Sequence, residues 1–156
     1  MKKILILLFL IALSFGVYYG YTNFVKIKIF KDYTAKSEIR DKALKDLSVN
    51  TSADSQGNNL IITAKWISEL KTNPKTSSVK MEIICTQTKS AKGKNLIVSA
   101  FMKGITETDS NTGSISCTIK KSDISSDRPY AWVKIISVID GKSQPPIIKY
   151  LGKFNQ

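Results

Sequence analysis

The chain has 156 residues, of which 24 are basic and 12 acidic, so its net charge is +12, and it contains no histidine. The missing histidine excludes Ser-His-Asp catalysis, Cys-His catalysis and His-ligated metal sites. Arg40 and Arg128 are the only arginines, which argues against nucleic-acid recognition, because paired contacts to bases and phosphates favour arginine over lysine.

An uncharged apolar run extends from Ile4 to Val25. As a helix this run would reach about 33 Å, enough to cross a hydrocarbon core of about 30 Å. It ends in a cluster of aromatic residues, which favour the membrane interface: Tyr18, Tyr19, Tyr21 and Phe24. We therefore predict that residues 1–26 form an uncleaved transmembrane anchor.

The alternative for this segment is a cleaved signal peptide. It has the basic start of such peptides in Lys2 and Lys3, and Ala12 and Ser14 could supply the small residues before a cleavage site. The apolar run continues well past Ser14, however, which favours the anchor. Lysines flank the run on both sides, so counting them does not choose an orientation.

Residues 27–47 are predicted to form a helical stalk. Ile39, Ala43, Leu44 and Leu47 fall on one helical face. Acidic residues also stand four positions before basic ones in this stretch, which is the favourable order for helical pairs.

Residues 48–156 are predicted to form an all-β domain, an antiparallel β-sandwich of about seven strands. Short alternating runs of apolar and polar residues follow one another, separated by turn-forming residues, as is typical of such sandwiches. The expected strands are 47–53, 60–66, 79–85, 95–102, 115–119, 129–139 and 147–154.

The last strand is expected to point Ile148, Tyr150 and Phe154 to one face and Lys149 and Lys153 to the other, as in an edge strand that is protected by charge.

The sixth strand supplies the candidate binding surface. If Val133, Ile135 and Ile139 face the core, the alternate residues form an exposed apolar stripe of the kind that marks interaction sites. The stripe consists of Tyr130, Trp132 and Ile136 beside Lys134.

The two cysteines, Cys85 and Cys117, each continue an apolar alternating row. We expect a disulfide between them, and such bonds persist outside the reducing cytosol. This places the β domain in a periplasm or at a cell surface.

Part of the chain resembles fibronectin type III and related immunoglobulin-like domains. The segment Ile62-Thr-Ala-Lys-Trp66 is similar to the second strand of that family with its core tryptophan, and Ile124, six residues before Tyr130, is similar to its tyrosine corner. Lys134 and the cysteine pair depart from the pattern. The resemblance implies a binding or spacing role, because these domains host many partners and few active sites.

No enzymatic activity, cofactor or metal is expected. The acidic pairs Glu107 with Asp109 and Asp123 with Asp127 could bind calcium weakly, but turn chemistry explains them as well.

The sequence therefore predicts a membrane-anchored extracytoplasmic protein–protein interaction module, an accessory subunit of a cell-envelope assembly whose partner is another envelope protein. In this hypothesis Lys149 and Lys153 adjust the rate of association with the partner and do not define the binding site. Two alternatives stay open: a pilin-like structural fibre subunit, and an electrostatic binder of anionic envelope polymers or lipid headgroups.

Overall fold

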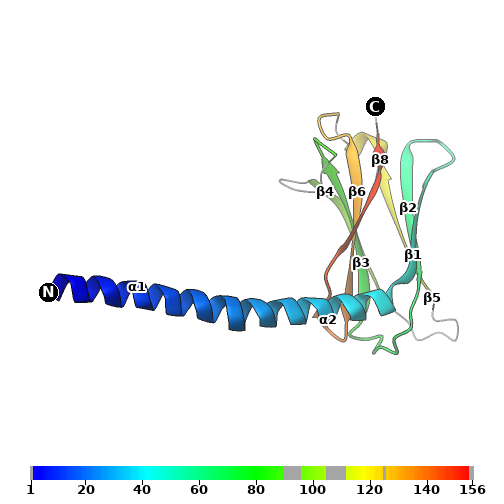
Figure 1. Ribbon diagram of the computed structural model, residues 1–156. Coiled ribbons are helices and arrows are strands. Elements are labelled where there is room, and N and C mark those ends of the chain that lie inside the picture. The colour runs from blue at the N-terminus through cyan, green and yellow to red at the C-terminus, as the bar shows by residue number, and fades with distance from the viewer. Residues whose placement is uncertain (1, 90–95, 105–111, 125, 155–156) are drawn as a thin grey trace. The chain divides into compact units, whose positions relative to one another are not determined.

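The computed structural model describes residues 2–89, 96–104, 112–124 and 126–154, with no side chains described for residues 96–104 (Figure 1). The chain divides into two compact units, Met1–Glu38 and Ile39–Gln156.

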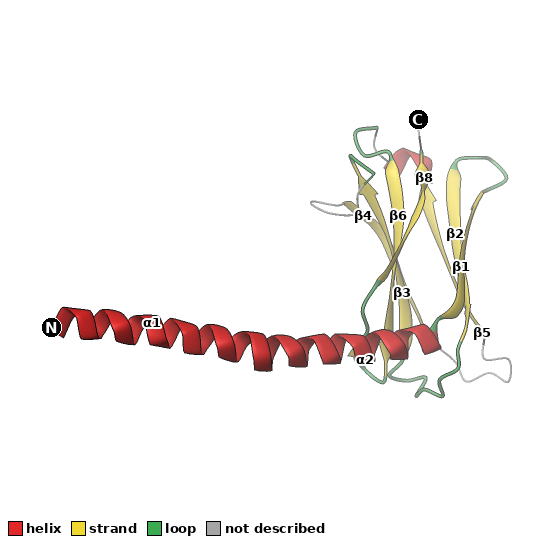
Figure 2. Ribbon diagram, viewed as in Figure 1, coloured by secondary structure: helices red, strands yellow, loops and turns green. Residues whose placement is uncertain are grey.

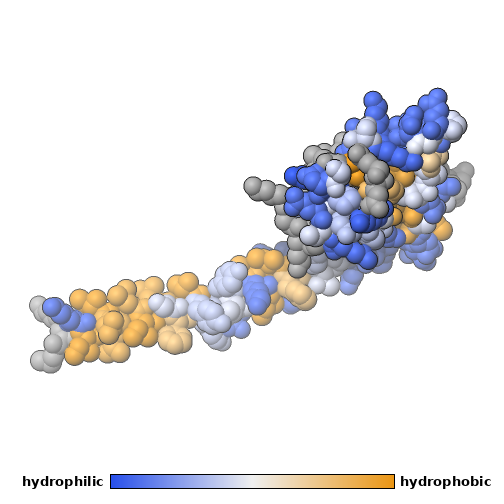
Figure 3. Space-filling view, turned by 90° about the horizontal axis from the view of Figure 1, so that it is seen from above, coloured by the Kyte–Doolittle hydropathy of each residue, from blue (hydrophilic) through white to orange (hydrophobic). Residues whose placement is uncertain are grey.

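The first unit is helical. It contains α1 (Lys2–Gly20), a π-helical segment (Tyr21–Lys26) and most of α2 (Ile27–Ala43). The continuous helix Ile6–Ala43 has 38 residues and is long and apolar enough to cross a membrane, although a signal sequence would pass the same test. Figure 3 shows hydrophobic residues along the visible face of its N-terminal part. The predicted apolar helix is therefore present.

Polar side chains within this helix bond to its own backbone. Ser14 Oγ donates to the carbonyl oxygen of Leu10 at 2.8 Å, and the Asn23 side-chain amide donates to that of Tyr19 at 3.1 Å. Unsatisfied polar groups are costly in a lipid environment. These internal hydrogen bonds make the polar residues compatible with a membrane-spanning helix.

The second unit consists of two antiparallel sheets (Figure 2). The first sheet has the order β1-β2-β5, and the second has the order β4-β3-β6, with β8 and the two-residue β7 also paired to β6. The strands are β1 (Lys45–Ala53), β2 (Asn59–Ile67), β3 (Ser78–Thr86), β4 (Leu96–Gly104), β5 (Thr112–Lys120), β6 (Tyr130–Ile139), β7 (Lys142–Ser143) and β8 (Ile147–Lys153). The prediction of a mostly-β domain with seven main strands is confirmed.

The core is built from alternate residues of both sheets, and Trp66 is buried in it as predicted. Opposite Trp66 in the β2–β5 pair lies Gly113, where a Cβ atom would overlap the indole ring. Only glycine at this position leaves room for the tryptophan in its present orientation.

The helix ends earlier than expected, at Ala43 instead of residue 47, and β1 begins at Lys45. Ala43 and Leu44 are both buried in the core of the second unit. The backbone N–H of Glu69 donates to the carbonyl oxygen of Lys42 at 2.9 Å, which satisfies one of the carbonyl groups left unpaired at a helix C-terminus. The last turn of α2 is thus part of the β domain.

The predicted disulfide is absent. Cys85 and Cys117 both lie in the described part of the chain, and no bond joins them. Cys85 is on β3 and Cys117 on β5, so they belong to different sheets. The cysteines therefore give no support for a location of the β domain outside the cytosol.

Candidate binding surface

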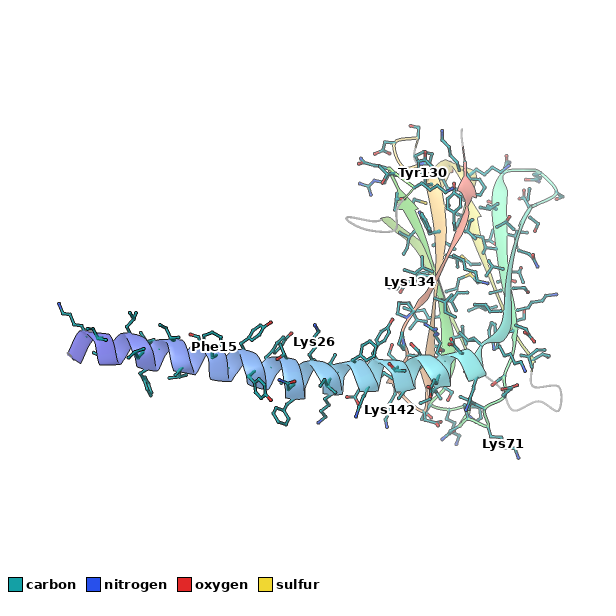
Figure 4. The ribbon with its side chains drawn as sticks, viewed as in Figure 1. Phe15, Lys26, Lys71, Tyr130, Lys134 and Lys142 are labelled. Atoms are coloured by element: carbon teal, nitrogen blue, oxygen red, sulfur yellow. The ribbon has the colours of Figure 1, made fainter. Side chains whose placement is uncertain are left out.

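The outward residues of β6 lie where the alternation of the sequence places them. Burial alternates along the whole strand, so that Val133, Ile135 and Ile139 face the core. The intervening side chains are half-buried on the outer face of the second sheet, and Figure 4 labels two of them, Tyr130 and Lys134. The predicted stripe, Tyr130, Trp132 and Ile136 beside Lys134, therefore shares one face.

The prediction for β8 was wrong, because Ile148 and Tyr150 do not share a face with Phe154, and Lys149 does not share one with Lys153. Ile148 and Tyr150 are 44% and 37% exposed, while Ile147, Leu151 and Phe154 pack against the core.

A bulge in the β6–β8 pairing explains part of this arrangement. Tyr150 lies opposite Trp132 and Gly152 opposite Ala131, so Leu151 is an extra residue between the two pairs. The extra residue reverses which alternate positions of the strand face outward. In consequence Lys153 lies opposite Tyr130, and Lys149 lies opposite the buried Val133. The two lysines do not share a face.

Together, β6 and β8 present one continuous surface, which we call the aromatic face: Tyr130, Trp132, Lys134 and Ile136 from β6, and Ile148 and Tyr150 from β8.

The rings of the aromatic face are held in place by their neighbours. The centroids of Trp132 and Tyr150 are 4.9 Å apart, with the rings inclined at 54°. The indole N–H of Trp132 donates to Thr86 Oγ1 at 3.1 Å. Lys89 Nζ lies 5.0 Å from the centroid of Tyr150, within the range of a cation–π contact. These contacts fix the orientation of Trp132 and Tyr150.

A buried carboxylate lies beneath the lysines of this face. Glu82 on β3 is almost fully buried and accepts hydrogen bonds from Lys80 and, at 3.1 Å, from Lys134. Burial acts to raise the pKa of the Glu82 carboxyl, but the two lysines outweigh that effect, and the pKa lies below its ordinary value. The positive charge of Lys134 is therefore partly neutralised within the protein.

Lys149 has a structural contact that the sequence did not indicate. Its amine donates to the carbonyl oxygen of Leu47 on β1 at 2.7 Å, and the residue is half-buried. This bond joins the edge strand of one sheet to the edge strand of the other.

The outer face of the first sheet is different in character. Its cross-strand neighbours include Thr63 and Ser116, whose hydroxyl oxygens are 2.9 Å apart, and Ser48 and Ser114 flank Lys65 in register. Short hydroxyl side chains dominate it, and it lacks an aromatic cluster among the described residues. The second sheet is therefore the better candidate for recognition.

Within the described residues, no group of three or more Cys, Asp or Glu side chains is placed to hold a metal ion. Of the two acidic pairs that the sequence singled out, Glu107 and Asp109 lie outside the described residues.

Several members of this surface were missed from the sequence: Ile148, Tyr150, Thr86, Lys89 and Glu82. Glu82 alternates with buried residues on β3, so its outward direction was readable from the sequence. Lys80 is expected on the same face of that strand as Glu82, whereas Lys134 becomes a neighbour of Glu82 only through the register of β3 with β6.

No family model and no curated protein matches the chain. Among solved structures, it is similar to β-glucosidase from Kluyveromyces marxianus at 8% identity and a TM-score of 0.34, over 70% of this chain and 14% of the enzyme. It is also similar to the sensor domain of the anti-sigma factor RsgI4 in Pseudobacteroides cellulosolvens, at 11% identity and a TM-score of 0.34, over 70% of this chain and 96% of that domain. The chain thus spans only a small part of the enzyme, and the scores are too low to indicate function.

Proposed function

We propose that this chain is a membrane-anchored extracytoplasmic module that binds another envelope protein through the aromatic face, as an accessory subunit of an envelope assembly. The observation that carries the proposal is the exposure of Ile148 and Tyr150 next to Trp132, on paired strands. Large rings in ordered positions are the residues that most often dominate binding energy at protein interfaces.

An immunoglobulin-like or fibronectin type III-like ancestry is part of the proposal. The first, second and fifth strands form one sheet, and the third, sixth and last strands lie together in the other, a grouping that immunoglobulin constant-type sandwiches share. The fourth strand differs, because it joins the second sheet. Tyr130 differs too, since it lies on the outer face, whereas the resemblance assigned it to a tyrosine corner. Domains of this architecture serve many binding functions.

The location outside the cytoplasm is supported by the N-terminal sequence. Lys2 and Lys3 directly precede the apolar run, an arrangement shared with export signals. The apolar helix then serves as the anchor.

The charges of the aromatic face support a protein partner over electrostatic adhesion to anionic polymers. Lys134 is paired with Glu82, and Lys149 is bonded to the Leu47 carbonyl. Lysine amines that are paired within the protein bind an external anion less strongly. The apolar side chains Trp132, Tyr150 and Ile148 therefore supply the main attraction.

The test is partner binding by variants of the full-length protein in detergent, after the co-purifying envelope protein has been identified. Trp132→Ala should cost about 2 kcal/mol or more, as expected of a hot spot, and Tyr150→Ala should also weaken binding. Ile67→Ala is the matched control, because Ile67 is 42% exposed on the first sheet. Lys153→Glu should mainly slow association.

Thermal unfolding of each variant separates a loss of binding from a loss of folding. Tyr150→Ala covers the case in which Trp132→Ala is unstable, since the indole bonds to Thr86. Loss of binding in Lys153→Glu alone, together with a steep dependence on salt, would instead establish electrostatic adhesion.

A further inference from the structure

β8 is an edge of the second sheet. Among the described strands it pairs with β6 alone, so the backbone groups on its other side have no strand partner. Unpaired strand edges are templates for the addition of another strand.

The usual protection of an edge strand lies at the ends of the stretch Ile147–Tyr150 and not within it, since Pro145 and Pro146 precede Ile147 and the bulge follows at Leu151. Charged side chains, proline and bulges are the common devices. Here the outward residues Ile148 and Tyr150 are apolar and exposed, and the bulge lies beyond them, at Leu151. The one charge between them, on Lys149, is directed to the carbonyl oxygen of Leu47 at 2.7 Å. The stretch Ile147–Tyr150 is therefore open to pairing.

We propose that the edge of β8 receives an extended acidic segment of the partner protein as an added strand. This inference rests on the proposed function and specifies how the partner is bound. Neighbouring strands lie about 4.8 Å apart, and side chains directly opposite each other have Cβ atoms about 5 Å apart. Alternate residues of the added strand would therefore extend the cluster of Trp132, Tyr150 and Ile148 on the aromatic face.

Charge complementarity indicates which kind of segment the edge of β8 would bind. Lys89 lies over Tyr150, and Lys153 lies 5.8 Å from the ring centroid of Tyr130, so cations flank both rings. A second copy of this chain has a net charge of +12 and would bring like charges to the edge, and like charges on paired strands are destabilising. An acidic segment of a different protein complements these lysines, whereas a second copy of this chain does not.

The test uses the full-length protein in detergent micelles and two capped ten-residue peptides, one alternating Glu with Val and the other alternating Lys with Val. Amide hydrogen exchange reports backbone pairing directly. The Glu–Val peptide should slow exchange within residues 147–150 by tenfold or more, and the Lys–Val peptide should leave it unchanged. Ile148→Glu, which removes an apolar contact and adds a like charge at the edge, should weaken binding of the Glu–Val peptide at least tenfold, while the matched control Ile67→Glu on the first sheet should leave it intact.

The other outcomes overturn the inference in distinguishable ways. If the Glu–Val peptide fails to bind, or binds without protecting β8, strand addition is wrong. The proposed function would then still be tested by the effect of Trp132→Ala on binding of the natural partner. Equal binding of both peptides would refute the charge selection. Protection of β8 without peptide, in a protein that sediments as a dimer, would assign the edge to a second copy.

Discussion

Replacing Glu82 with glutamine should destabilise the β domain. Its side chain is only 5% exposed and is bonded by both Lys80 and Lys134. Glutamine has nearly the same shape and can still accept a hydrogen bond, so the substitution chiefly removes the negative charge. The change leaves two lysine amines on the face without their counter-ion.

The magnitude follows from the number and exposure of these contacts. A hydrogen bond to a charged group contributes about 1.5–3 kcal/mol. Because both lysines reach solvent, with side-chain exposures of 36% and 28%, water can solvate their amines once the carboxylate is gone. The combined loss should therefore lie near the low end for one such bond, at about 2 kcal/mol.

Glu69→Gln is the matched control. Glu69 pairs with Lys45 at 2.6 Å, but both side chains are about half exposed, at 48% and 50%. Exposed ion pairs are worth about 1 kcal/mol or less. Urea unfolding followed by tryptophan fluorescence measures both free energies, and an equal change in the midpoint for the two variants would refute the burial argument.

The pH dependence adds an independent check. The pKa of Glu82 in the folded protein lies below the ordinary value of 4.5. A lowered carboxyl pKa contributes stability that is fully present above about pH 4.5 and is lost as the pH falls through the folded-state pKa. The difference between wild type and Glu82→Gln should therefore shrink below about pH 4.5. A difference that stays constant from pH 7 to pH 3 would show that Glu82 acts by packing alone.

Two further predictions concern the core and the anchor. Gly113→Ala should cost about 1–3 kcal/mol through overpacking, because its new methyl group would overlap the Trp66 ring; urea unfolding measures this loss, and a variant as stable as wild type would show that the ring can move. The intact mass of the protein from membranes should correspond to a chain that retains Met1–Val25. A mass that corresponds to a start at Phe15 would instead identify a cleaved signal peptide.

The sequence predicted those features that depend on local alternation. The inward row of β6 and the core position of Trp66 follow from the period of two in a strand, and the apolar helix follows from an uncharged run. The alternation of β8 was misread because a single extra residue at Leu151 reverses it, and the bulge exists only through pairing with Ala131 and Trp132.

Contacts between segments that are far apart in the sequence could not be predicted either. Cys85 and Cys117 both lie on buried rows, yet only strand order shows that they belong to different sheets. The end of the helix at Ala43 depends on burial of Ala43 and Leu44 in the β core and on the N–H of Glu69, more than twenty residues further along the chain. A prediction from apolar periodicity alone therefore placed the end of the helix too late, at residue 47.

The burial of both thiols makes the natural chain a convenient background for chemical labelling. Cys85 and Cys117 are almost inaccessible to solvent, and burial raises the pKa of the Cys85 thiol, an effect that the charge of Arg128 opposes only in part. Maleimides react with accessible thiolates, so a folded wild-type protein should incorporate little reagent. A cysteine introduced at an exposed position such as Lys28 or Ser52 would then be modified selectively, and a membrane-impermeant reagent applied to intact cells would report on which side of the membrane that residue lies.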